Sequence, residues 1–458
     1  MSNVEEREPA DVASSAAQVH TLWVEAAWLG SLVENVRFKI QGDRIVEIQR
    51  GVLRTGGELQ LRGLAIPGLI NAHSHAFHRL LRATSNVGQS SFWDWQREMY
   101  RVAAKLTPDN YRQLATAVFT EMVLAGITTV GEFHYIHHQP DGTPYVDSNA
   151  MGSAIVAAAG DVGIRLTLID ACYLRGWFDK EVSGAQRRFS DGSVDKWLTR
   201  VDRLQDGALI RHAVGAHSVR SVAPGDIARI VNYARDRAMP IHAHVSEQPV
   251  ENEACLEHTG LTPIGVFDQA GALAARFTAV HATHASPQDI TLLGQAGAIV
   301  CFCPTTERDL ADGIGPSGML TDAGATLALG SDSHAVIDLF IEMRLVELHQ
   351  RLASSRRGTH QGAHLIDMGT VHGAKSLGWD DAGSLTVGGL ADITIVSRDT
   401  VRTVASRSGA LEMLVFSATA ADVTDTIVGG RRVVDEGRHH RYGDGVQTLL
   451  QAQLLFAE

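Results

Sequence analysis

The chain contains 458 residues, of which 45% are hydrophobic and 20% are charged, a composition typical of a globular protein rather than a disordered or fibrous one. Its 52 acidic residues outnumber its 40 basic residues, and the formal net charge of −12 argues against nucleic acids and anionic membranes as partners. Four cysteines are too few for a disulfide framework in a chain of this length.

The first segment, residues 1–18, is polar and acidic, and we expect it to be a flexible tail. It has neither the basic start nor the apolar stretch of a signal peptide, and no apolar run reaches the roughly 18 residues of a membrane span. We therefore expect a soluble, cytoplasmic protein. Residues 19–66 follow as short alternating runs with a Gly42-Asp43 turn signal, which predicts hairpins of β-strands.

From residue 67 to residue 382, short apolar runs alternate with helical segments such as 108–126 and 224–238. Alternation of this kind predicts a parallel sheet with right-handed crossovers, and eight strands fit a (β/α)8 barrel of the TIM type. A doubly wound open sheet is the alternative, but no G-x-G-x-x-G motif follows the first strand. The eight strand candidates lie within 64–75, 126–134, 164–173, 208–218, 239–248, 277–284, 296–304 and 325–334.

Strand patterns return after residue 383, in GSLTVGGLADITIVS and DVTDTIVGGRRVVDEG. Neither terminal set of hairpins is long enough to form a core of its own. We therefore predict one small composite β-sandwich domain from both termini, residues 19–66 and 383–458, attached to the barrel of residues 67–382.

Polar residues collect at the ends of the predicted barrel strands, where a barrel places its active site. His73 and His75 stand two residues apart, so both imidazoles point to the same side of a strand. The next strand ends in this group are His244, followed by Glu247 as a carboxylate suited to proton transfer, then His281 and Asp332. Four polar groups at strand ends of one barrel predict a metal site, because unpaired they would be costly to bury.

The strand candidate IRLTLIDACY has no lysine, and its only carboxylate is Asp170. Two-metal barrel hydrolases often need a bridging lysine or carboxylate near the end of such a strand, and the lysine is missing here. We expect a single divalent ion bound by His73, His75, His244 and Asp332, with a water completing the shell. Three nitrogens and one oxygen suit Zn²⁺ best, with Fe²⁺ or Mn²⁺ as alternatives. A second site among the histidines of EFHYIHH, residues 132–138, is a further alternative.

These motifs resemble those of the amidohydrolase superfamily, in its mononuclear deaminase-like branch. Within that branch the chain is similar to the formimidoylglutamate deiminases, in the same order from about Trp23 to about Gly437. The metal motifs are shared by many deaminases, and the combination of SFWDW, EFHYIHH and HSVR is the more specific part. The motifs that carry the resemblance are HSHAFHR at 73–79, SFWDWQREMYR at 91–101, GEFHYIHH at 131–138, HSVR at 217–220, HAHVSEQ at 242–248, HATH at 281–284 and SDSH at 331–334.

The resemblance implies hydrolysis of N-formimino-L-glutamate to N-formyl-L-glutamate and ammonia in histidine degradation, by a metal-activated water in a homodimer. Glu247 and His281 resemble the family's proton-handling pair, with Asp332 as ligand and proton acceptor. The residues that resemble substrate contacts are His78, Tyr135, His217 and Arg220. The only partner implied is the small-molecule substrate.

Two positions depart from the family pattern. His78 stands where the family often has Gln, and Gln96 stands where it often has Arg, with Arg97 next. Either Arg97 contacts a substrate carboxylate or the loop is remodelled. Two alternatives therefore stay open: a deaminase for another formimino amino acid or a heterocyclic amine, and a non-catalytic barrel that binds a partner protein.

Overall fold

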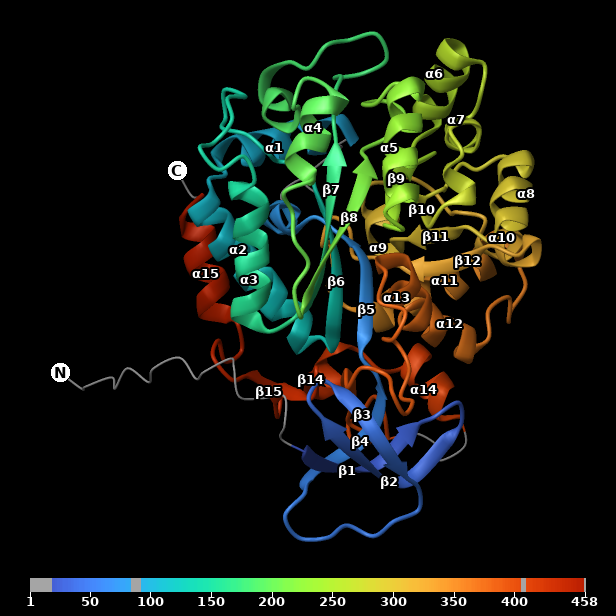
Figure 1. The fold of residues 1–458 in the computed structure, drawn as a ribbon. Coiled ribbons are helices and arrows are strands. Elements are labelled where there is room, and N and C mark those ends of the chain that lie inside the picture. The colour runs from blue at the N-terminus through green and yellow to red at the C-terminus, as the bar shows by residue number, and fades with distance from the viewer. Residues whose placement is uncertain (1–18, 84–91, 405–408, 457–458) are drawn as a thin grey trace, which may run out of the picture.

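The computed structural model describes residues 19–83, 92–404 and 409–456, and the expected tail of residues 1–18 lies outside them. Its centre is an eight-stranded parallel barrel, surrounded by helices (Figure 1). The strands are hydrogen bonded in chain order, and all eight strand candidates are confirmed. Their bounds are β5 Leu69–Ser74, β6 Ile127–His134, β7 Arg165–Cys172, β8 Ile210–Ala216, β9 Ile241–Val245, β10 Phe277–His281, β11 Ile299–Phe302 and β12 Thr326–Leu329.

The barrel closes where its first and last strands meet. Ser74, which follows His73 at the end of β5, forms an isolated parallel bridge with Asp332, just beyond β12. Every residue of β6 and β7 is buried, as expected for parallel strands covered on both faces. The (β/α)8 prediction is therefore confirmed, and the open-sheet alternative is not.

Helices separate the strands and form the outer layer (Figure 1). The helical segments expected at 108–126 and 224–238 are confirmed as α2 and α5, and the Thr107 side chain caps α2 by accepting from the Asn110 amide. The helices of this layer are α1 Phe92–Lys105, α2 Pro108–Leu124, α3 Ala150–Val162, α4 Val194–Val201, α5 Pro224–Asp236, α6 Pro249–Thr259, α7 Pro263–Gln269, α8 Pro287–Ala296, α9 Pro304–Asp309, α10 Ser317–Ala323, α11 Leu339–Ser354, α12 Gly362–Met368 and α13 Val371–Leu377.

A second sheet joins both termini, as the composite domain required. Hydrogen bonds link its strands edge to edge in the order β16-β15-β14-β13-β4-β1-β2-β3, so the expected sandwich is one continuous sheet. The reason is that β4 pairs with β1 on one edge and with β13 on the other. The bounds are β1 Val19–Trp28, β2 Leu32–Gln41, β3 Arg44–Gln49, β4 Leu59–Pro67, β13 Ile393–Val396, β14 Val423–Val428, β15 Arg431–Asp435 and β16 Arg438–His439.

Two C-terminal helices do not follow the expected domain boundary. α14 (Ala410–Phe416) packs on α11 and α12, and α15 (Val446–Leu454) packs on α2, beside the barrel (Figure 1). The buried side of α15 explains this placement, since Ala452 is buried and Leu449 packs against the barrel's core. Part of the segment 383–458 therefore covers the barrel instead of the terminal sheet.

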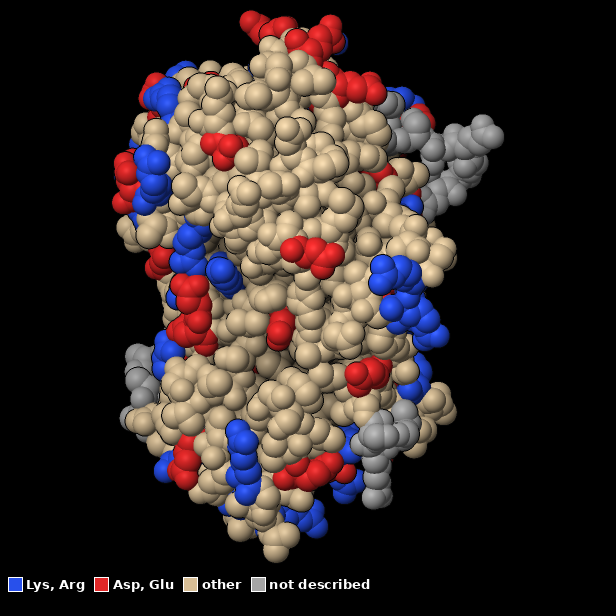
Figure 2. All heavy atoms as spheres, turned by 90° about the vertical axis from the view of Figure 1, so that its right-hand side faces the viewer, with Lys and Arg blue, Asp and Glu red and all other residues tan. Residues whose placement is uncertain are grey.

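The surface is mixed in charge on the face seen in Figure 2, where basic and acidic side chains are interspersed among uncharged residues. Among the described residues, no helix is both long and apolar enough to cross a membrane. The four cysteines are free and buried.

Candidate metal centre and pocket

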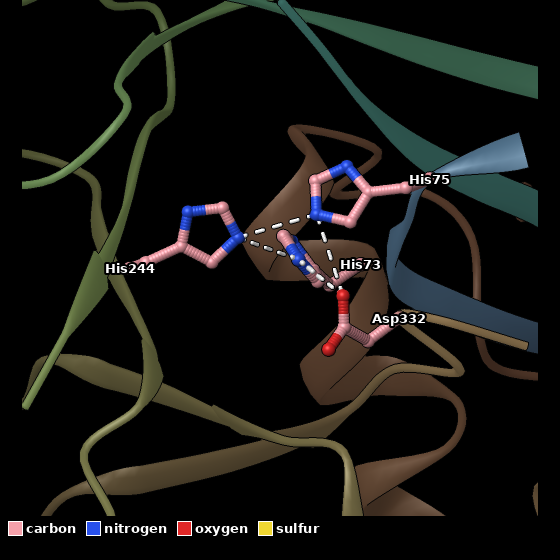
Figure 3. A group of neighbouring side chains, drawn as sticks. All are labelled: His73, His75, His244 and Asp332. Carbon is pink, nitrogen blue, oxygen red and sulfur yellow. Dashed lines mark hydrogen bonds and ion pairs between the residues drawn. The ribbon is translucent and has the colours of Figure 1, made fainter. Parts of the chain in front are cut away.

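Three imidazoles and one carboxylate converge at the carboxyl end of the barrel, from β5, β9 and the turn after β12 (Figure 3). The Nε2 atom of His244 lies 3.1 Å from Nε2 of His73 and 3.3 Å from Nε2 of His75. The Oδ1 atom of Asp332 lies 3.4 Å from His73 Nε2 and 3.3 Å from His75 Nε2. All four residues are buried. The structure thus brings together the four residues that the sequence predicts as ligands.

The spacing of this cluster fits one divalent ion. Nitrogen and oxygen ligands about 2.1 Å from a shared ion lie about 3 to 4 Å from one another, and the four separations given above fall in this range. His75 donates from Nδ1 to the carbonyl oxygen of Phe133 at 2.9 Å, and His244 donates from Nδ1 to that of His217 at 2.9 Å. The two facing Nε2 atoms therefore both carry lone pairs, and a cation between them removes their repulsion.

Burial also keeps the histidines in the form that binds metal. Loss of hydration lowers the pKa of His73 to about 3 and outweighs the effect of the nearby Asp332 carboxylate. A neutral imidazole is the form that ligates metal ions. The residues in the cluster therefore fit a divalent ion in charge as well as in distance.

Backbone contacts between β5 and the β12 turn hold two of these ligands in place. The amides of Ser331 and Asp332 both donate to the carbonyl oxygen of His73 at 3.0 Å. A Cβ atom at Gly330 would lie 2.8 Å from the Cβ of His73, so only glycine allows this approach. Asp332 itself has a φ of +41°, an uncommon backbone conformation that costs energy and aims its carboxylate at the imidazoles.

Glu247 and His281 lie beside the ligands. Nε2 of His281 is 4.0 Å from Glu247 Oε1 and 3.8 Å from Asp332 Oδ2. On its other side, Nδ1 of His281 is 3.4 Å from Oε1 of Glu307, a buried residue of α9. Burial lowers the pKa of His281, but the hydrogen bond with Glu307 and the charges of Glu247 and Asp332 outweigh it and raise the pKa to about 10. His281 can therefore act as a cationic hydrogen-bond donor at neutral pH.

Arg220 lies on the other side of Glu247. Its guanidinium donates to Glu247 Oε2 at 3.1 Å and lies 3.7 Å from Glu251 Oε1. Burial disfavours the charged form, but these two carboxylates raise the pKa of Arg220 above its ordinary value. The arginine therefore stays charged and holds one oxygen of Glu247 while the other faces His281.

The ligand cluster opens into a cavity of about 690 Å³, whose lining includes His78, Tyr135, His217 and Arg220. The Tyr135 hydroxyl and His78 Nε2 are 3.1 Å apart, and both residues are buried. The ring of His217 lies 5.0 Å from that of His244 and 5.2 Å from that of Tyr135. These four candidate substrate contacts thus share one cavity with the metal cluster.

Arg97 is not brought to this cavity. Its side chain is 71% exposed on α1 and pairs with Asp94, whereas Gln96 lines the cavity. The structure therefore does not place Arg97 where the expected contact with a substrate carboxylate would require it. The aromatic residue Trp95 lines the cavity as part of its wall, while the placement of the Phe92 and Trp93 side chains lies outside the description.

Several residues that line the cavity or support it were not predicted from the sequence. Glu307 follows Pro304 at the start of α9 and accepts from the Cys303 amide at 2.9 Å, a helix-start pattern that could have marked it as buried. Tyr100, Tyr173 and Gln186 also line the cavity. Tyr100 lies within the SFWDWQREMYR motif, but no spacing rule links it to Tyr173 or Gln186, which lie far along the chain.

The second histidine group faces the helical layer instead of the cavity. Asp170 lies near His134 and His137, but Arg200 binds both of its oxygens, at 2.6 Å and 2.8 Å, and the Trp197 indole donates to it at 2.8 Å. The carboxylate is therefore already neutralised. This cluster is a buried ion-pair network, and it does not support the alternative of a second metal site.

The fold and the site together define a (β/α)8-barrel enzyme with a candidate metal centre at its mouth. The chain belongs to the amidohydrolase family, whose sequence model matches residues 64–433.

Relatives agree with this assignment and with the resemblance expected from the motifs. A formimidoylglutamate deiminase of Pseudomonas aeruginosa is 35% identical over 88% of this chain and 92% of its own length. An 8-oxoguanine deaminase of the same species is 30% identical over 82% of this chain and 83% of its own.

Solved structures show the same fold. The crystal structure of an amidohydrolase from Brucella melitensis superposes with a TM-score of 0.87 and 29% identity, covering 96% of this chain and all of that one. A zinc-bound adenosine deaminase from Xanthomonas campestris gives a TM-score of 0.82 at 22% identity, covering 95% and 97%, and shows the fold alone.

Proposed function

We propose that this protein hydrolyses the formimino group of N-formimino-L-glutamate to give N-formyl-L-glutamate and ammonia, as a step of histidine degradation. The observation that carries the proposal is the position of Glu247, between the cationic His281 and Arg220 and beside the ligand cluster. The 35% identity with a formimidoylglutamate deiminase supports the same reaction. In this reaction water adds to the formimino carbon, the bond to the terminal nitrogen breaks, and that nitrogen leaves as ammonia.

The ligand set of His73, His75, His244 and Asp332 favours one Zn²⁺, with Fe²⁺ or Mn²⁺ as alternatives. When bound, such an ion supplies a nucleophile at neutral pH, because it lowers the pKa of a water ligand to about 7. The protein's own part is to move protons and to hold the substrate.

Proton transfer is assigned to three side chains around the cluster. Asp332 accepts a proton from the attacking water through Oδ2, which faces His281 at 3.8 Å. Glu247 carries a proton to the imino nitrogen, so that neutral ammonia departs. His281 donates from Nε2 and stabilises the charge that develops on oxygen as the carbon becomes tetrahedral.

Substrate binding needs local positive charge, because the substrate has two carboxylates and the chain carries a net charge of −12. Arg220 supplies the charge: two of its nitrogens face Glu247 and Glu251, and the third can donate to a substrate carboxylate. His217, Tyr135 and His78 supply further polar contacts from the same cavity.

A second candidate, deimination or deamination of a different compound, is favoured by one observation. Gln96 lines the cavity while Arg97 faces solvent, so the cavity has one cation fewer than the family resemblance implies. The relative that deaminates 8-oxoguanine, by its name, makes a heterocyclic amine the first alternative to test.

The test is ammonia release from N-formimino-L-glutamate by the metal-loaded enzyme, with and without a chelator, against 8-oxoguanine as the competing substrate. We expect activity on the first compound that the chelator abolishes. Arg220→Gln should raise KM at least tenfold, and Arg97→Gln is the matched control that should leave KM unchanged. Release of ammonia from 8-oxoguanine alone would contradict the proposal.

A further inference from the structure

A polar wall in the cavity joins three residues that are far apart in sequence. Tyr100 comes from α1, Tyr173 follows β7 directly, and Gln186 belongs to the short 3-10 helix Gly184–Phe189. Nε2 of Gln186 lies 3.1 Å from the hydroxyl oxygen of Tyr100 and 3.1 Å from that of Tyr173. All three side chains line the cavity. A single amide therefore fixes the positions of both hydroxyl groups.

The orientation of this amide is set by two backbone groups. Oε1 of Gln186 accepts from the Ser183 amide at 3.2 Å, and Nε2 donates to the Gly176 carbonyl oxygen at 3.2 Å. An amide nitrogen can only donate, and its two hydrogens are shared among the Gly176 carbonyl oxygen and the two tyrosine oxygens. The Tyr173 hydroxyl is also hydrogen bonded to that of Tyr100, a bond that raises the pKa of Tyr173 and lowers that of Tyr100, so Tyr173 donates and Tyr100 accepts. The wall therefore presents the hydrogen of the Tyr100 hydroxyl as a donor, oriented by Tyr173 and Gln186.

His217 lies between this wall and the ligand cluster. The ring of Tyr173 is 4.8 Å from the ring of His217, which is in turn 5.0 Å from the ring of His244. Arg220 is close enough for its charge to lower the pKa of both tyrosine hydroxyls, although burial has the larger, opposite effect. A substrate group bound at this wall must therefore be separated from the reacting carbon by several covalent bonds. The nearby charge of Arg220 favours a negative charge on that group.

We propose that Tyr100, oriented by Tyr173 and Gln186, donates a hydrogen bond to the side-chain carboxylate of the substrate. This inference rests on the proposed function. A carboxylate oxygen can only accept hydrogen bonds, so it matches the remaining hydrogen of the Tyr100 hydroxyl. This donor adds to Arg220, two of whose nitrogens already face Glu247 and Glu251. In N-formimino-L-glutamate the side-chain carboxylate, not the one next to the formimino nitrogen, has the reach for this wall.

The experiment compares N-formimino-L-glutamate with N-formimino-L-norvaline, which has the same carbon chain without the side-chain carboxylate. Tyr100→Phe should lower kcat/KM for the glutamate compound about tenfold, mainly through KM, because a hydrogen bond to a charged group is lost. Tyr173→Phe should change kcat/KM in the same direction, because Tyr100 loses the hydroxyl that orients it. Neither change should affect the norvaline compound. Tyr233→Phe is the matched control, since Tyr233 donates to Asp202 on the surface at 2.7 Å.

The outcomes separate this inference from the proposed function. If the wild type is active but both variants keep its preference for the glutamate compound, the subsite is wrong and the function stands. If the wild type hydrolyses neither compound, the function fails, and calorimetric binding of L-glutamate to the metal-loaded enzyme decides on the subsite. About tenfold weaker binding by the Tyr100 variant supports it, whereas equal affinity or no binding by the wild type overturns it. Tyr100 is half-buried, so its variant should fold even if the Tyr173 variant does not.

Discussion

The backbone amide of Asp332 donates to the carbonyl oxygen of His73 at 3.0 Å, and the side chains of the same two residues approach to 3.4 Å. These residues stand beyond β12 and at the end of β5, the last and first strands of the barrel. The hydrogen bonds that close the barrel therefore also set the distance between two ligands. The same backbone contacts therefore close the barrel and position His73 and Asp332 in the metal cluster.

The convergence of four ligands on one point predicts the effect of removing one of them. His244→Asn should reduce bound metal from about one equivalent to well below one and abolish ammonia release, because three ligands remain in a cluster shaped for four. Metal analysis of the purified variant measures this. His258→Asn on the outer helix α6 is the control and should keep both metal and activity.

Glu247→Gln should lower kcat about 100- to 10,000-fold, the range expected for loss of a general acid–base group. Metal content should stay at the wild-type level, because Glu247 is not among the four clustered ligands. Steady-state kinetics with metal analysis tests both points, and Glu253→Gln, an exposed change on the same segment, controls for charge. Wild-type kcat in the Glu247 variant would remove this residue from the mechanism.

Glu307→Gln should move the alkaline side of the pH–rate profile to lower pH. The carboxylate of Glu307 is one of three that raise the pKa of His281 to about 10, so an amide in its place lets His281 lose its proton at a lower pH. We expect kcat near pH 7 to fall about tenfold, the size typical of a residue that orients an active-site histidine. A profile with unchanged shape would show that Glu307 acts only as a helix-start contact for Cys303. Glu257→Gln is the exposed control.

Asp170→Asn should destabilise the protein by about 3–5 kcal/mol, because it leaves the Arg200 charge buried with a weaker partner. Burial raises the pKa of Asp170, but the charge of Arg200 outweighs it and holds the pKa well below its ordinary value. Because its pKa is depressed in the folded protein, ionised Asp170 stabilises the fold at pH values above about 4, and this stabilisation is lost as the pH falls further. Unfolding by denaturant at pH 7 and pH 3.5 should show a smaller pH effect in the variant than in the wild type. Asp195→Asn, at an exposed ion pair, should change little.

Much of the barrel could be predicted because each buried strand is an apolar run that ends in a polar motif. The ligands followed from the same pattern, since residues at strand ends share one face of the barrel. Arg97 shows where this reasoning stops. Consecutive residues on a helix point about 100° apart, so Gln96 and Arg97 of α1 cannot both face the cavity, and only the packing of α1 decides between them.

The terminal sheet shows a second limit. Local patterns indicated strands at both ends of the chain, but not which edges would pair. The partner of β4 on its outer edge is β13, where Pro67 stands opposite Ile393. Hydrogen bonds of this kind depend on the whole chain, as do the contacts of Gln186 with Tyr100 and Tyr173.

The pairing of β4 with β13 also has a consequence for synthesis on the ribosome. β4 is made before any barrel strand, yet its partner emerges only after all eight, so one edge of β4 stays unpaired while the barrel is being built. An unpaired edge can pair with another chain, and contacts so distant in sequence form slowly. The free edge of β4 is therefore covered only after the last quarter of the chain has begun to emerge. We expect nascent chains that stall before β13 to be the species most prone to aggregate.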